Sequence, residues 1–380
     1  MGFIDRYRRF AELTDEEVRE EFRARADEQR RRDLERVEVL DLSATTHEEL
    51  PHPAVAAAIS FAGKRALNRA GDPLSGELRD LLAGLSGVER GNVAVGPGAT
   101  GLIGALATAV LGPGDVLATP WPSYPVYPLA AAAAGADAVP LGPDRSPQAI
   151  ATAVAAEPRT RMLVICNPND PDGSLMNADE LAQLRELLPK SVLLVIDEAL
   201  ADYAGAEHLK ATARLSEDSS GVVLVRTMSK AWGLAGLRVG WLIGSEDSRE
   251  LFSRMSPLLG VSGPSEAGAI AAIREAGDTP GRRAREARRE LQRLQTTLLG
   301  TPIEVADSHA NFAWIRIPGM SAEDLTVRLL AAGVRVMDGT SVGAPDHIRA
   351  TLRGDSTATE RLAEGLLAAA SAAQAPSPAD

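Results

Sequence analysis

The stretch VVLVRTMSKAWGLAGLRVGWLIG (Val222–Gly244) contains two apolar runs, residues 222–227 and 239–244, that enclose a polar turn. Lys230 stands in this turn between two hydroxyl residues and a glycine-punctuated segment, and Arg238 follows eight residues later. A surface lysine needs no such setting. A lysine that acts as an amine nucleophile does, because it must be held, partly desolvated and aimed at a carbonyl. The stretch therefore predicts a functional lysine just past a buried strand.

More short runs of Val, Leu and Ile alternate with helical patterns between residues 65 and 258. They are NVAV (92–95), DVLATP (115–120), DAVPL (137–141), MLVICNP (162–168) and VLLVIDE (192–198). Nearly continuous apolar runs separated by helices are typical of a mostly parallel sheet that is buried on both faces. We therefore predict an α/β fold, in which a large domain holds a mostly parallel seven-stranded sheet covered by helices.

Beyond residue 260 the pattern changes to that of a smaller α+β domain. A long helix rich in Arg and Glu leads to the runs NFAWIRI (311–317), GVRVM (333–337) and HIRATLR (347–353). We predict a large domain over residues 65–258 and a small domain over residues 259–370. Residues 41–64 are predicted to be the amino-terminal part of the small domain. The tail, residues 371–380, is predicted to be disordered.

Residues 1–40 are dense in Arg and Glu and are predicted to be helical, with a capping box at Thr14 and Glu17. Two interpretations account for this composition. One is a solvated helix, and the other is an arm that contacts a second subunit. We favour the solvated helix.

The composition is that of a globular protein, with 45% hydrophobic and 24% charged residues. A net charge of -12 argues against binding to nucleic acid and against attachment to an anionic membrane. Cys166 is the only cysteine, which excludes an internal disulfide and suits a reducing compartment. The amino terminus lacks the apolar core of a signal peptide, and the alanine-rich runs are too short to span a bilayer. We expect a soluble cytoplasmic protein with neither nucleic-acid nor membrane partners.

In open α/β sheets, ligands bind beyond the carboxyl ends of the strands. After the first run, Gly96, Gly98 and Gly101 satisfy the dinucleotide-binding pattern G-x-G-x-x-G. The acidic residue that would bind a ribose is missing from the end of the next run, which reads ATPWPSY. What remains is a predicted phosphate-binding turn at the start of a helix, with a purely structural glycine turn as the alternative.

The other strand ends carry an aromatic residue, a polar turn and an acid. Tyr124 is suited to stacking on a flat ring, while Trp121 and Tyr127 equally fit a core. The turn CNPNDPDG is rich in Asn, Pro, Asp and Gly, and this composition forms a loop whether or not the turn binds a ligand. Asp197 follows five apolar residues, so its buried carboxylate needs a cationic partner, and a structural ion pair with an arginine would meet the same need. Together with Lys230, these residues indicate a ligand with a phosphate, a flat ring and an aldehyde, which is pyridoxal 5'-phosphate. We predict no metal site.

The segment SKAWGLAGLRVG (229–240) resembles the motif S-K-x-x-x-x-A-G-x-R-x-G of fold-type I pyridoxal-phosphate enzymes. Within them, the chain is similar to class I/II aminotransferases of the histidinol-phosphate aminotransferase type, over roughly residues 40–365. This resemblance implies an aspartate aminotransferase-like fold and a homodimer.

The resemblance also implies a role for each matching residue. Lys230 would form the aldimine and shuttle protons, Asp197 would keep the pyridine nitrogen protonated, and Tyr124 would stack on the ring. Arg349 would grip the substrate carboxylate as a bidentate fork. The other implied cofactor contacts are Gly98, Ala99, Thr100, Asn167, Asp170, Thr227, Ser229 and Arg238, and Asn311 is the second implied substrate contact.

Four residues depart from the family pattern. In the motif N-P-x-N-P-T-G, Asp170 replaces the second Asn, which donates to the phenolic oxygen of the cofactor, and Asp172 replaces Thr. Leu200 replaces a tyrosine that also contacts this oxygen, and Ala70 replaces a tyrosine that reaches the phosphate from the partner subunit. An ionised Asp170 would repel the oxygen, so it is expected either to be protonated or to have turned away.

The resulting prediction is a transferase that moves an amino group between an amino acid and a 2-oxo acid, through a Lys230 aldimine and a quinonoid. The first alternative keeps the same quinonoid but uses it for β- or γ-elimination, replacement, carbon–carbon bond formation, cyclisation or decarboxylation. A non-catalytic relic of the fold is a further alternative, which the intact Lys230 and Asp197 argue against. The least favoured alternative is a nicotinamide-dependent dehydrogenase. The sequence does not indicate which side chain the substrate carries.

Overall fold

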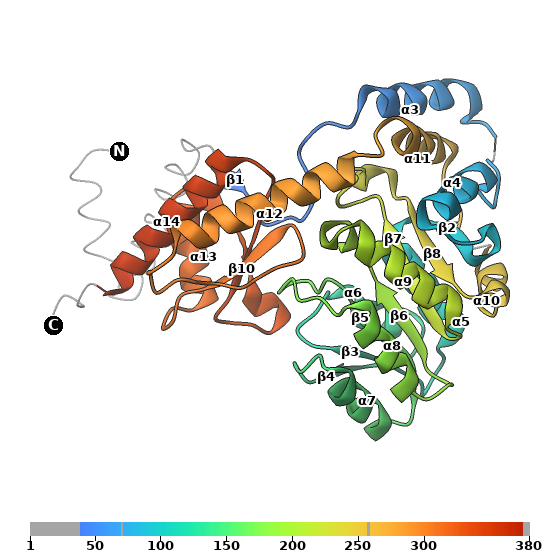
Figure 1. The fold of residues 1–380 in the computed structure, drawn as a ribbon, viewed down its shortest axis with the longest axis horizontal. Helices are drawn as coiled ribbons and strands as arrows, with labels where there is room; N and C mark the ends of the chain where they lie inside the picture. The colour runs from blue at the N-terminus through green and yellow to red at the C-terminus, as the bar shows by residue number, and fades with distance from the viewer. Residues whose placement is uncertain (1–38, 70, 257–258, 375–380) are drawn as a thin grey trace, which may run out of the picture.

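The computed structural model describes residues 39–374, except residues 70, 257 and 258. The predicted helical segment 1–40 therefore lies almost entirely outside the described residues, as does Ala70. Figure 1 shows two domains, with the long helix α12 (Thr279–Thr297) running from one into the other. Within the described residues, no helix combines the length and the apolar character needed to cross a membrane.

The large domain is built on a seven-stranded sheet of the described residues, in the order β2-β8-β7-β6-β5-β3-β4. All strands run in one direction except β8, which is antiparallel to both of its neighbours. The strands are β2 (Val93–Gly96), β3 (Val116–Pro120), β4 (Asp137–Leu141), β5 (Thr160–Cys166), β6 (Leu193–Asp197), β7 (Val222–Thr227) and β8 (Gly240–Gly244). The prediction of a mostly parallel sheet made from these apolar runs is confirmed.

Apolar side chains alternate between the two faces of this sheet, as the two-residue period of a strand requires. The helices and 3-10 turns of this domain include α4 (Gly76–Ser86), η1 (Arg90–Asn92), α5 (Gly98–Val110), α6 (Val126–Ala133), α7 (Pro147–Ala156), α8 (Ala178–Leu187), η2 (Ala201–Ala204), α9 (Ala206–Asp218), η3 (Ala235–Leu237) and α10 (Ser248–Met255). In β5, Leu163 and Ile165 pack into the core beneath α4, α7, α8 and α11 (Gly263–Glu275), whereas Met162 and Val164 pack into the core beneath α5, α6 and α10. Burial on both faces explains why the runs are continuously apolar.

The small domain has an antiparallel sheet in the order β12-β13-β10-β9 and a parallel pair formed by β1 and β11. Its elements, besides α12, are β1 (Leu40–Asp41), β9 (Glu304–Val305), β10 (Phe312–Arg316), α13 (Ala322–Ala331), β11 (Val334–Arg335), β12 (Met337–Asp338), η5 (Gly339–Val342), β13 (Ile348–Thr351) and α14 (Ser356–Gln374). The helix α14 continues to Gln374, into the first four residues of the tail for which disorder is predicted. The rest of the predicted tail lies outside the described residues.

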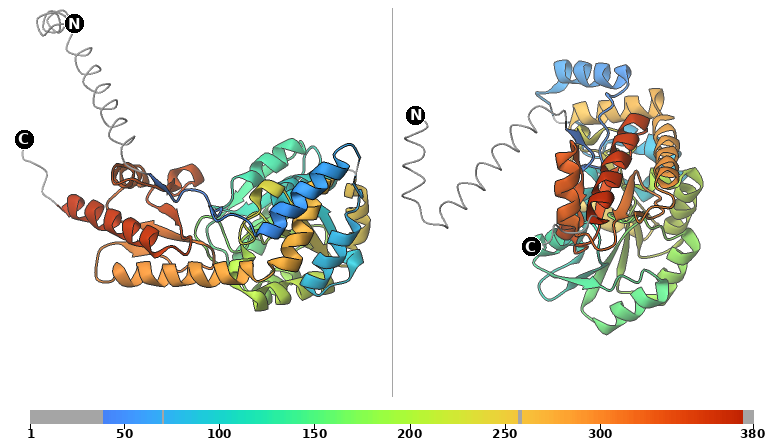
Figure 2. Two further views of the ribbon diagram at one scale, coloured as in Figure 1. Left: turned by 90° about the horizontal axis from the view of Figure 1, so that it is seen from above. Right: turned by 90° about the vertical axis from the view of Figure 1, so that its left-hand side faces the viewer.

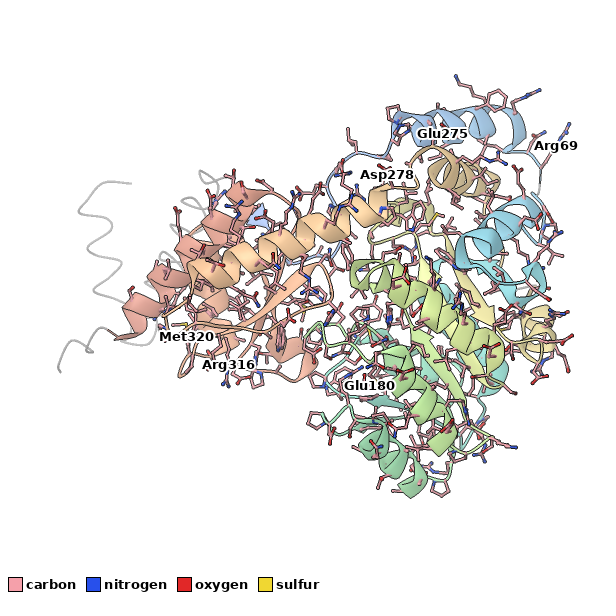
Figure 3. The ribbon with its side chains drawn as sticks, in the orientation of Figure 1. Arg69, Glu180, Glu275, Asp278, Arg316 and Met320 are labelled. Atoms are coloured by element: carbon pink, nitrogen blue, oxygen red, sulfur yellow. The ribbon has the colours of Figure 1, made fainter. Side chains whose placement is uncertain are left out.

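Two predicted domain boundaries differ from the packing. The helices α3 (Pro53–Ala66) and α11 (Gly263–Glu275) lie against each other, as two views in Figures 1 and 2 show, and both contribute to the core of the large domain. Val55 and Ala269 are buried in that core, although residues 41–64 and 259–370 were predicted to belong to the small domain. Figure 3 labels Glu275 and Asp278, which flank the short link between α11 and α12 where the chain leaves the large domain.

Candidate active site

A cavity of about 170 Å³ opens at the carboxyl end of the parallel sheet. Cys166, Asp197 and Thr227 end the strands β5, β6 and β7, respectively, and all three line it. The full lining comprises Thr46, Ala99, Thr100, Tyr124, Cys166, Asp170, Asp197, Ala199, Leu200, Thr227, Ser229, Lys230, Ala235 and Arg238. The structure thus brings most of the predicted site residues to one place. Leu200, which replaces the family's tyrosine, presents only carbon to this cavity.

Lys230 lies in the turn after β7, and its amine donates a hydrogen bond to the hydroxyl of Thr45. Burial lowers the pKa of the Lys230 amine, because the charged form loses its hydration there. Its backbone is also held from outside the turn, since Arg283 of α12 donates to the carbonyl of Ala231 at 3.0 Å and to Glu49 at 2.8 Å. Thr45 and Arg283 were missed by the sequence analysis, and no local motif marks either of them.

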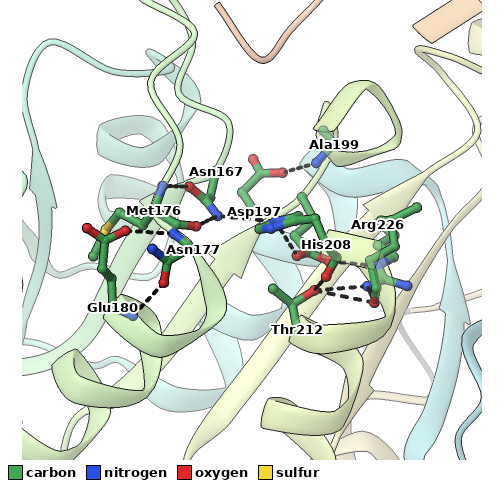
Figure 4. Close-up of polar contacts among 11 residues, drawn as sticks. Asn167, Met176, Asn177, Glu180, Asp197, Ala199, His208, Thr212 and Arg226 are labelled. Atoms are coloured by element: carbon green, nitrogen blue, oxygen red, sulfur yellow. Dashed lines mark hydrogen bonds and ion pairs between the residues drawn. The ribbon is translucent and has the colours of Figure 1, made fainter. Parts of the chain in front are cut away.

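Asp197 is buried at the end of β6, where the hydroxyl of Tyr127 donates to it at 2.9 Å and the N–H of Ala199 at 3.0 Å. Figure 4 shows the second of these contacts. Burial raises the pKa of the Asp197 carboxyl to about 6, against the opposing effect of the two hydrogen bonds. Among the described residues, no cationic side chain forms an ion pair with Asp197, so the structural ion pair considered above is not found there. The hydrogen bond from Tyr127 to Asp197 was not predicted, because the sequence around Tyr127 equally fits an aromatic residue of the core.

Hydroxyl and cationic groups gather where α5 begins. Thr227 donates to Ser229 at 3.0 Å, and Arg238 donates to the Ser229 hydroxyl at 3.3 Å. Gly98 opens α5 with a φ of +77°, and a Cβ at this position would lie 2.8 Å from Nη2 of Arg238. Among the described residues, no side chain caps the amino terminus of α5, so its first N–H groups can bind a ligand. A phosphate suits this combination of helix amino terminus, hydroxyls and guanidinium.

Tyr124 lines the cavity and packs edge-on against Tyr127, with 5.8 Å between ring centroids and 76° between ring planes. The interpretation of Tyr127 as a core residue holds for its ring, which is fully buried.

The polar turn after β5 is held by its own side chains. Asn167 uses both ends of its amide on the backbone of Met176, accepting from its N–H at 2.8 Å and donating to its carbonyl at 2.9 Å, as Figure 4 shows. Asn167 is not among the residues that line the cavity. Its predicted contact with the cofactor stays a prediction. Asp172 accepts hydrogen bonds from the side chain of Asn169 and from the N–H and hydroxyl of Ser174, and so it stabilises this turn.

Arg349, on β13 of the small domain, is paired with Asp170 of the large domain. Its Nη1 donates to Oδ1 of Asp170, and both side chains are nearly buried. Asp170 is therefore turned toward an arginine, a partner that the expectation of a protonated or turned-away carboxyl did not name. Asn311 donates to the carbonyl of Thr45 at 3.1 Å, which fixes the segment that carries the hydrogen-bond partner of Lys230.

The family model "Aminotransferase class I and II" matches residues 37–366. The chain belongs to this family. It is 34% identical over 304 residues to the aromatic amino acid aminotransferase of Thermobifida fusca, covering 78% of this chain and 84% of the relative. It is also 34% identical over 309 residues to the histidinol-phosphate aminotransferase of Erythrobacter litoralis, covering 80% of this chain and 83% of the relative. Histidinol-phosphate aminotransferase from Sinorhizobium meliloti, solved with pyridoxal-5'-phosphate, superposes with a TM-score of 0.79 at 25% identity, covering 91% and 94% of the two chains.

This class I/II aminotransferase uses pyridoxal 5'-phosphate, as the sequence predicted. The residues at the cavity fit that cofactor. The buried carboxylate of Asp197, which has no ion-pair partner among the described residues, suits a protonated ring nitrogen. The hydroxyls, Arg238 and N–H groups at the start of α5 suit the phosphate, and the Lys230 amine suits the aldehyde. The prediction of an aspartate aminotransferase-like fold is confirmed too, since an aspartate aminotransferase of Thermus thermophilus superposes with a TM-score of 0.75 at 22% identity.

Proposed function

We propose that Lys230 is the catalytic residue with which this aminotransferase moves an amino group between an amino acid and a 2-oxo acid. The observation that carries this proposal is the buried Lys230 amine, whose lowered pKa favours the neutral form that can accept a proton. When bound, pyridoxal 5'-phosphate supplies an aldehyde that takes the amino group and a ring that withdraws electrons.

Each remaining side chain binds, orients or holds a proton. Nζ of Lys230 accepts the proton from the α-carbon of the substrate and later donates it to a different atom of the reacting pair. The carboxylate of Asp197 holds the proton on the ring nitrogen, and Tyr124 stacks against the ring. Arg238, Ser229 and Thr227 hold the phosphate together with the N–H groups that begin α5, including those of Gly98, Ala99 and Thr100.

On the substrate side, Arg349 is proposed to bind the α-carboxylate, and Asn311 to hold the segment that contacts Lys230. Among amino acids, those with aromatic side chains are proposed as donors, because relatives that are 34% identical are aromatic amino acid aminotransferases. The chain is further proposed to act in the cytoplasm as a homodimer. Its single buried cysteine supports a reducing compartment, and light scattering over a dilution series tests the dimer.

Transamination is tested by mixing the purified holoprotein with a panel of amino acids in the absence of an oxo acid. Conversion of the cofactor to its amine form, with one equivalent of 2-oxo acid released, is the expected result. Release of ammonia or of carbon dioxide while the cofactor keeps its aldehyde form would contradict transamination and favour elimination or decarboxylation.

A further inference from the structure

Both terminal nitrogens of Arg349 are already used by the chain. Nη1 donates to the Asp170 carboxylate, and Nη2 donates to the carbonyl of Ser43 at 2.8 Å. Nε is a further donor, which is buried and has no partner among the described residues. The guanidinium also lies 5.3 Å from the ring centroid of Phe312, which restricts its movement on that side. A substrate carboxylate that approaches Arg349 therefore meets a guanidinium whose two terminal nitrogens already bind a carboxylate and a carbonyl.

The charges of Arg349 and Asp170 make it unfavourable for a second carboxylate to join the pair. Arg349 and Asp170 are 8% exposed each, so the pair is removed from most of the solvent. One buried positive charge is balanced by one buried negative charge. A second carboxylate in the same place would leave one negative charge without a partner, which a poorly hydrated site penalises. Two other cations lie near the cavity. Arg238 lies with the hydroxyls at the start of α5. Lys230 donates to Thr45 and interacts with the charges of both Asp170 and Arg349, but burial favours its neutral form, so it offsets little of this imbalance.

We propose that Asp170 is a specificity-determining residue that occupies the carboxylate position of Arg349. A substrate carboxylate binds only by displacing Asp170 from the guanidinium. A primary amine that has the same side chain but no α-carboxylate enters with the pair intact and escapes this cost. The site therefore discriminates only weakly between an amino acid and the corresponding amine. This inference rests on the proposed role of Arg349 in binding the substrate carboxylate.

The test compares phenylalanine with phenethylamine, which differ only in the carboxylate. Their dissociation constants are measured from the change in the cofactor spectrum of wild-type and Asp170→Asn holoprotein, without an oxo acid present. Asparagine keeps an oxygen that accepts from Arg349 but carries no charge. We expect the dissociation constant of phenethylamine divided by that of phenylalanine to be at least tenfold larger in Asp170→Asn than in the wild type, because Asp170→Asn binds phenylalanine more tightly. A change in the cofactor itself affects both ligands and cancels in the ratio.

Asp172→Asn is the matched control, because it makes the same chemical change in the same turn and Asp172 does not contact Arg349. It should leave the ratio unchanged. A second measurement is independent of turnover and of imine formation. Maleate, a dicarboxylate without an amine, should raise the thermal unfolding midpoint of Asp170→Asn more than that of the wild type.

Arg349→Gln separates this inference from the proposed function. If Arg349→Gln weakens phenylalanine binding while Asp170→Asn leaves the ratio unchanged, the competition is overturned and the role of Arg349 stands. If neither substitution affects phenylalanine binding, both the competition by Asp170 and the proposed role of Arg349 are overturned. Equal stabilisation of the wild type and Asp170→Asn by maleate would likewise overturn the competition.

Discussion

The hydroxyl of Tyr127 donates a 2.9 Å hydrogen bond to Oδ2 of Asp197, and both residues are almost completely buried. Tyr127 lies on α6 and Asp197 ends β6, and these two elements come together only when the chain folds. Since Asp197 has no ion-pair partner among the described residues, this phenol and one backbone N–H are the contacts that oppose the effect of burial on its pKa.

Tyr127→Phe should therefore raise the pKa of Asp197 further above about 6 and weaken cofactor binding. A neutral acid cannot pair with the protonated ring nitrogen, and a hydrogen bond to a charged group is worth about 1.5–3 kcal/mol. We expect the dissociation constant of the cofactor, measured by equilibrium dialysis at pH 7, to rise roughly tenfold or more. Tyr203→Phe is the control, because the buried Tyr203 hydroxyl has no hydrogen-bond partner among the described residues. Equal constants in the two variants would contradict the role of Tyr127.

Removal of the Asp197 charge should stabilise the cofactor-free protein. Because its folded pKa is raised from 3.8 to about 6, the folded state binds the proton more tightly than the unfolded chain does. The contribution of Asp197 to stability is therefore lost as the pH rises from about 4 to about 6. At pH 7.5, cofactor-free Asp197→Asn should exceed the wild type in free energy of unfolding by up to about 3 kcal/mol. Urea unfolding at several pH values would show this difference, which should vanish below about pH 4.

Lys230→Ala should keep the fold and lose turnover by a factor on the order of 10² to 10⁴ or more, because it removes the group that moves the proton. Purified wild-type protein should be yellow, and borohydride should attach the cofactor to Lys230. Mass spectrometry of the digested protein locates the label. A label on any other lysine would refute the assignment of the site.

Gly98→Ala should weaken phosphate binding, for two reasons that the geometry supplies. The φ of +77° disfavours any residue with a Cβ, and that Cβ would lie 2.8 Å from Nη2 of Arg238. We expect a loss of about 1–2 kcal/mol in stability and a weaker hold on the cofactor. Gly104→Ala, in the same helix α5, meets no atom within 4 Å and should be neutral or stabilising by up to about 1 kcal/mol. Thermal unfolding of both variants, with and without cofactor, measures the contrast.

Asp170→Asn should lower the pH midpoint at which the visible absorption band of the bound cofactor changes. The carboxylate lines the cavity beside Lys230, and its negative charge favours the protonated form of the cofactor–lysine link. Absorbance titrations of wild-type and variant holoprotein from acid to alkaline pH give the two midpoints. Identical midpoints would mean that Asp170 acts on Arg349 alone.

The parts of the site that the sequence predicts lie at strand ends. Lys230 and Asp197 follow long apolar runs, and the parallel sheet brings such positions together whatever the details of packing. Thr45 and Arg283 could not be found in this way. Each reaches the Lys230 turn through the docking of one domain on the other, and no local periodicity encodes that arrangement.

The departures from prediction have similar causes. The pairing of Asp170 with Arg349 joins residues 179 positions apart, and a motif comparison evaluates each position alone. The helices α3 and α11 were placed in the wrong domain because their helical patterns show that they bury a face but not which core receives it.

Within the described residues, the chain passes between the two domains in the segment after β1 and again through α12. Arg283 lies on α12, and its guanidinium binds both Glu49, in the segment after β1, and the carbonyl of Ala231, next to Lys230. A displacement of α12 relative to the large domain would therefore pull on the backbone next to Lys230, because the same guanidinium holds both contacts.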